Sequence, residues 1–157
     1  MRKNKFSLAY KDSALVELVQ SVEHNILAAW AIECVERVLP YFENQFPDDP
    51  RPRQALVTLQ EWMDTGVFKM AVIRGASLAS HASAREVGED TPARSAARAA
   101  GQAVASAHVP DHAIAAANYC LQALHRAADP QDADELVKGE RAWQYQRLLE
   151  LHQRRNT

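Results

Sequence analysis

A run of small residues in the centre of the chain limits what it can fold into. Between positions 71 and 133 the sequence holds 21 alanines in 63 residues. The stretch 92–107 is the extreme case, because Arg94, Arg98, Gln102 and Val104 are almost its only large side chains. A helix that is small on nearly every face buries little apolar surface by itself, so it needs other helices around it at short distance. We therefore predict that 92–107 is the central helix of an α-helical bundle.

The rest of the sequence is rich in helix-forming residues, and no segment alternates apolar and polar residues as a strand does. Proline, glycine and capping residues divide it into about seven helices. These are expected near 12–22, 26–42, 52–66, 67–87, 92–107, 110–128 and 132–151, with 47–53 as a proline-rich loop. Asp12 and Thr91 are expected caps, Gly66 an expected stop, and Pro40 an expected kink. We predict an all-α fold, with residues 1–157 in a single domain whose ends, 1–11 and 152–157, are flexible.

Charge and cysteine content narrow the classes of partner. The 157 residues include 18 basic and 20 acidic side chains, for a net charge of -2, which gives no general attraction to nucleic acid or to an anionic membrane. No apolar run reaches the roughly 18 residues of a membrane span, and the basic start lacks the apolar core of a secretion signal. Cys34 and Cys120 form no CxxC pair, which is typical of a reducing compartment. We expect a cytoplasmic protein without a nucleic-acid or membrane partner.

Two arginines mark the start of the predicted central helix. Arg94 and Arg98 stand four residues apart, so they share one face of the helix. The N-terminal end of a helix disfavours cations, so both guanidinium groups need partners. Carboxylates at positions 86, 89 and 90 lie just upstream and would make the pair structural. The alternative is a binding site for an anion or an acidic partner.

Three histidines are the candidates for a metal or acid/base site. His108 and His112 stand four residues apart with Asp111 between them, and His81 lies on an earlier helix. Two imidazoles on one helical face would suit zinc, but Pro110 intervenes and no third ligand stands at motif spacing. We expect instead that His108 ends one helix and His112 opens the next. We expect His81 to be hydrogen-bonded in or near the core.

Other signatures of catalysis are missing from the sequence. There is no glycine-rich phosphate loop and no nucleophile elbow. Cys34 is flanked by Glu33 and Glu36, and neighbouring acids raise the pKa of a thiol, which disfavours a nucleophile. The three tryptophans fall on apolar stripes and are expected core anchors. We predict no catalytic residue, no metal and no cofactor.

One block of sequence resembles a known family. The block TPARSAARAAGQAVASAHVPDHAIAAANYCLQAL, residues 91–124, resembles the hallmark region of the Imm-five-like helical immunity proteins of bacterial polymorphic-toxin systems. Weaker matches lie at 30–56 and 140–150, so the resemblance covers most of the chain. It implies an all-α protein that binds and blocks a cognate toxin in the cytoplasm of the producing cell. It also places Arg94, Arg98, His108 and His112 at recurring polar positions of that family, so these four are the candidate binding residues.

Three hypotheses follow from the sequence. The first is a stoichiometric inhibitor whose partner is the cognate toxin domain, with segment 43–53 as the first surface to inspect. The second is a small metal-dependent or acid/base enzyme that uses His81, His108 and His112, which requires these imidazoles to converge. The third is a structural helical module or a homodimer that pairs through an exposed alanine face.

Overall fold

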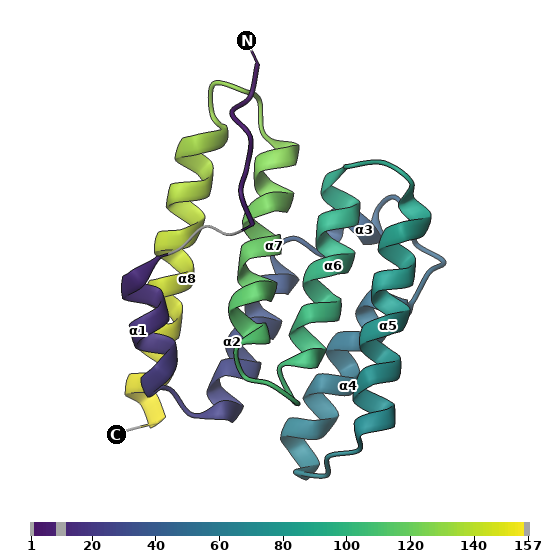
Figure 1. Ribbon diagram of the computed structural model, residues 1–157, viewed down its shortest axis with the longest axis vertical. Coiled ribbons are helices and arrows are strands. Elements are labelled where there is room, and N and C mark those ends of the chain that lie inside the picture. The colour runs from purple at the N-terminus through teal and green to yellow at the C-terminus, as the bar shows by residue number, and fades with distance from the viewer. Residues whose placement is uncertain (1, 9–11, 156–157) are drawn as a thin grey trace.

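The computed structural model describes residues 2–8 and 12–155, which contain eight α-helices and no strand. The helices are α1 (Ser13–Ser21), α2 (His24–Glu36), α3 (Pro40–Glu43), α4 (Arg51–Thr65), α5 (Met70–Val87), α6 (Pro92–Ala105), α7 (His112–Ala127) and α8 (Ala133–Arg155). Helices α8, α7, α6 and α5 lie in a row, and α2 and α4 pack behind it (Figure 1). The predicted all-α bundle is confirmed.

The alanine-dense helix α6 lies in the interior of the bundle, as predicted. It packs between α5 and α7 and also contacts α2, α3 and α4 (Figure 1). Its buried residues are all small or medium: Ala93, Ser95, Ala96, Ala97, Ala99, Ala100, Gly101, Ala103 and Val104. Helix α5 approaches so closely that two of its serines reach the α6 backbone. Ser80 Oγ donates to the carbonyl of Ala97 at 2.7 Å, and Ser77 Oγ donates to that of Gly101 at 2.9 Å.

The expected helix caps are present. Asp12 accepts a hydrogen bond from the backbone N–H of Leu15 at 3.1 Å, which satisfies a free donor at the start of α1. Thr91 does the same for Arg94 at the start of α6, with Pro92 in the first helical position. Gly66 ends α4 with a φ of 69°, a left-handed conformation that glycine adopts without steric cost.

The structure divides two segments differently from the prediction. The expected helix 26–42 is two helices, because α2 ends at Glu36 and α3 begins at Pro40. Proline has no N–H and its ring crowds the preceding turn, so it opens a new helix instead of kinking the old one. Proline also explains the second difference. Residues 51–53, predicted as loop, form the first turn of α4, where Pro52 fits.

Helices α2 and α8, on the other side of the bundle from α5, are linked by a tryptophan hydrogen bond and an ion pair. Trp30 of α2 is fully buried, and its indole N–H donates to the carbonyl of Gln144 at 2.8 Å. Arg37 pairs with Glu140 at 2.7 Å, so α2 and α8 are linked by charge as well as by packing. Cys34 is fully buried, and burial raises the pKa of its thiol, in the direction expected from the sequence.

The two ends of the chain are only partly described. Residues 1, 9–11 and 156–157 lie outside the described part, so the flexibility expected of 1–11 and 152–157 stays a prediction. Among the described residues near the N-terminus, Lys3 donates to the carbonyls of His125 and Arg126 at 2.9 Å. At the other end of the chain, α8 continues to Arg155. None of the described helices combines the length and the apolar character that crossing a bilayer requires.

Candidate functional site

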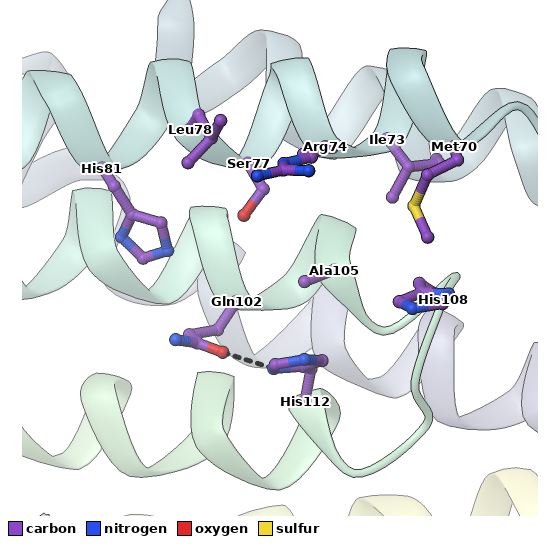
Figure 2. A pocket seen from close by; sticks show the side chains of 10 residues that line it. All are labelled: Met70, Ile73, Arg74, Ser77, Leu78, His81, Gln102, Ala105, His108 and His112. Atoms are coloured by element: carbon purple, nitrogen blue, oxygen red, sulfur yellow. Dashed lines mark hydrogen bonds between the residues drawn. The ribbon is translucent and has the colours of Figure 1, made fainter.

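A pocket of about 360 Å³ opens between α5 and α6, closed at one end by the α6–α7 loop and the start of α7. His81, His108 and His112 all line it, although they come from three different segments (Figure 2). Met70, Ile73 and Leu78 of α5 give the pocket an apolar wall, and Arg74 stands among them. The convergence that the enzyme hypothesis required is therefore partly met.

His81 is held against the backbone of the central helix. Its Nδ1 lies 3.2 Å from Arg98 Nη1. A guanidinium can only donate, so Nδ1 accepts and the ring proton is on Nε2. Position 101 is glycine, and a Cβ there would lie 2.8 Å from His81 Nε2, which leaves no room for a side chain. Burial, followed by the charges of Arg98 and Arg85, lowers the pKa of His81 to about 4, so the ring is neutral at pH 7.

The other two histidines have separate partners. His112 opens α7, as predicted, and its Nδ1 lies 2.7 Å from Gln102 Oε1 (Figure 2). Since that oxygen is an acceptor, Nδ1 donates. Contrary to the prediction, His108 does not end a helix, because α6 stops at Ala105 and His108 lies in the loop that follows. Its ring stacks on Phe68, with 5.9 Å between the ring centroids. Among the described residues, no group of three His, Cys, Asp or Glu side chains is close enough to hold one metal ion.

The structure separates the four candidate binding residues. Arg98 reaches the pocket through His81, and His108 and His112 line it directly. Arg94 is elsewhere, because it pairs with Asp90 at 2.9 Å and donates to the carbonyl of Ala84 at 3.1 Å. Arg94 therefore ties the end of α5 to the start of α6, which is the structural role expected for the pair. Arg98 departs from that expectation, since its partner is an imidazole instead of a carboxylate.

The sequence pointed to segment 43–53 as a candidate binding surface. In the structure, the arginines of this segment form ion pairs with carboxylates of the same chain. Arg53 bonds Glu43 at 2.7 Å and also pairs with Glu36. Arg51 bonds Asp49 at 2.8 Å and also pairs with Glu86 of α5. These contacts hold α4 against its neighbours and leave few free charges for a partner.

A comparison with protein families matches residues 17–151 to the family described as "Imm-5 like putative immunity protein". The chain belongs to this family. No curated protein and no solved structure matches the chain. The match covers all the helices from α2 to α7, so the whole pocket of this Imm-5-like protein lies inside the family region.

Four side chains at the mouth of the pocket were missed in the sequence of this Imm-5-like protein. Phe68, Met70, Arg74 and Leu78 are exposed, and Leu78 is 54% accessible. A signal for them exists in VFKMAVI, residues 67–73, where six of seven residues are apolar. An amphipathic helix buries one stripe, and here only Ile73 is buried, so the surplus apolar residues must face solvent.

Proposed function

We propose that this chain is an immunity protein that neutralises a cognate bacterial toxin by stoichiometric binding in the cytoplasm of the producing cell. The family match over residues 17–151 carries this proposal. Inhibition of this kind requires no turnover. It requires a surface that complements the toxin, with a few anchor side chains that supply most of the binding energy.

The size of the pocket suits a recess within a larger binding surface. His81 and His112 each spend one ring nitrogen on a neighbouring side chain, and His108 is stacked on Phe68. Ten residues line the pocket, whereas a protein interface of standard size takes roughly 20–30 residues from each partner. The pocket can therefore seat one or two side chains of a partner while the surrounding surface supplies the rest of the contact.

Co-expression with the toxin encoded by the neighbouring gene tests the proposal. Cells that produce the active toxin together with this chain should grow, and cells with the toxin and an empty vector should die. A catalytically inactive toxin provides the control for expression burden. Continued killing while the chain accumulates in soluble, folded form would contradict the proposal.

The gathering of three histidines in one pocket keeps the acid/base enzyme as a second candidate. In their neutral forms His81 presents an N–H at Nε2, whereas His112 presents a lone pair at Nε2, so the pocket holds one donor and one acceptor. An enzyme would inactivate many toxin molecules per copy. A His112→Ala variant would then lose protection, whereas a binding protein that uses a broad surface would lose only part of its affinity.

A further inference from the structure

We propose that one surface, the α5 face, docks an acidic surface of the cognate toxin. The α5 face is defined as Phe68, Met70, Arg74, Leu78 and Arg85, together with the histidine-lined pocket that it borders. This inference rests on the proposed function and names the surface that performs it. Three independent features of the described residues support it.

The first feature is position. Helix α5 lies at one edge of the row of helices, and only Ile73, Ser80, Ser83 and Ala84 of its eighteen residues are buried (Figure 1). Arg74, Leu78, His81 and Arg85 recur at steps of four, three and four, so they form one stripe along the helix. Figure 2 shows Arg74 and Leu78 on α5, across the pocket from Gln102 and His112.

The second feature is a concentration of apolar side chains in solvent. Of the eleven large apolar residues that are exposed in the described part of the chain, five lie between Val67 and Leu78. Met70 and Leu78 line the pocket and Phe68 stacks on His108 beside it, whereas Val67 and Val72 line the adjoining groove between α4 and α5. Single exposed apolar residues are ordinary on a protein surface, but a cluster of this kind marks an interaction site. Val109, in the loop beside His108, is also exposed and adds to the same end of the bundle.

The third feature is positive charge that is not tied up in ion pairs among the described residues. Away from this face, arginines are commonly tied to carboxylates, as in the pairs Arg53–Glu43, Arg94–Asp90 and Arg147–Glu33. On the α5 face, Arg74 and Arg85 form no ion pair with any described carboxylate. The same holds for Lys69, which directly precedes α5.

The acids near this face leave its positive charge in place. Glu86, which follows Arg85 in the sequence, pairs with Arg51, and Glu61 lines the groove between α4 and α5 that Lys69 also lines. Neither acid forms an ion pair with Arg74 or Arg85. Arg98 is bonded to an imidazole that is neutral at pH 7. In a chain of net charge -2, this local excess of cations fits an acidic partner.

The pocket can bind one acidic side chain of that partner. Arg74 and the Nε2–H of His81 are donors suited to a carboxylate, and Met70, Ile73 and Leu78 suit its methylene stem. An anchor of this kind in a largely apolar, desolvated recess is what concentrates binding energy at protein interfaces. A nucleic-acid-cleaving toxin lines its substrate groove with Lys and Arg, so the α5 face would be repelled from such a groove and would contact the toxin elsewhere.

Binding of the purified, catalytically inactive toxin domain to variants of the full chain tests the inference. Arg74→Glu and Leu78→Asp should each weaken the Kd at least about 10-fold, as expected for interface anchors. The matched controls are Lys138→Glu and Leu136→Asp on α8, at comparably exposed positions of the same residue classes or charge. These should change the Kd less than about 2-fold, and the wild-type Kd should rise with salt concentration. Circular dichroism and Tm should show all four variants folded.

Each outcome bears on the inference. Loss of binding in the α5 variants alone supports it. Wild-type affinity in folded Arg74→Glu and Leu78→Asp variants overturns it while leaving the proposed function intact. A wild-type dimer that both α5 substitutions dissociate, with toxin affinity unchanged, would show that a second copy occupies this face and would also overturn it. A wild-type chain that fails to bind the toxin at all would overturn the proposed function together with the inference.

Discussion

The imidazole of His81 lies flat against the central helix because position 101 has no side chain. Arg98 fixes its Nδ1, and the α6 backbone at Gly101 supports the ring from below. Neither contact is visible in the sequence, since residues 81, 98 and 101 belong to two helices whose register is set only by packing. The sequence predicted a hydrogen-bonded histidine near the core, and the structure supplies its partner.

Gly101→Ala should displace this ring. The new Cβ would lie 2.8–3.0 Å from three ring atoms, so His81 must swing toward solvent. The pKa of His81 should then rise from about 4 toward its ordinary value of 6.5, as measured by NMR titration. Stability should change little, because alanine gains about 1 kcal/mol of helix propensity over glycine and the lost hydrogen bond costs about as much.

Gly75→Ala is the matched control, because nothing lies within 4 Å of a Cβ at that position. It should stabilise the protein by about 0.5–1 kcal/mol and leave the His81 titration unchanged. An unchanged His81 pKa in Gly101→Ala would show that the ring does not rest on the helix backbone.

The same histidine should make stability depend on pH. Its pKa is lowered in the folded chain, mainly by burial and then by Arg98, so the unfolded chain binds more protons between pH 6.5 and about 4. The contribution of His81 to the free energy of unfolding is therefore fully present above pH 6.5, and it is lost as the pH drops toward 4. In His81→Gln this part of the loss should vanish, a difference of about 1–2 kcal/mol after screening at a partly buried site. Urea unfolding of both proteins at several pH values in this range measures the difference. The prediction is contradicted if the free energy of unfolding depends on pH equally in the two proteins.

At the scale of elements, the composition of α6 settles most of the architecture. The sequence predicted a central small-residue helix, its cap at Thr91 and the stop at Gly66, because composition and local capping chemistry determine these features. It did not predict the break between α2 and α3 or the exposed apolar side chains on α5. Those depend on how helices pack, since Pro40 allows either a kink or a break and only the fold shows which face of α5 has no neighbour.

Ala100→Leu should test how tightly α6 is enclosed. Ala100 is fully buried. The α5 helix lies so close to α6 that its serine side chains donate hydrogen bonds to α6 backbone carbonyls. Extra methylenes at such a site should cost about 1–3 kcal/mol or more by overpacking, measured as the free energy of unfolding in urea. Ala71→Leu on the exposed side of α5 makes the same chemical change and should stay within about 0.5 kcal/mol of wild type. Equal stability of the two variants would mean that α6 is not enclosed.

At the scale of the molecule, the two sides of the bundle differ in how their charges are used. On the α2–α8 side, Arg37 pairs with Glu140 and Arg147 pairs with Glu33. The α5 side leaves cations and apolar side chains together in solvent beside a pocket. This asymmetry is what a protein that binds one partner through one face requires, and family membership alone does not locate it.

The proposed immunity function requires that the chain acts by binding, one copy to one toxin. Titration of a fixed amount of active toxin with the purified chain tests it most directly. Toxin activity should fall linearly and end at a molar ratio of one, and Arg74→Glu should shift the curve toward weaker binding. Complete loss of toxin activity at a small fraction of one equivalent would show turnover and contradict the claim.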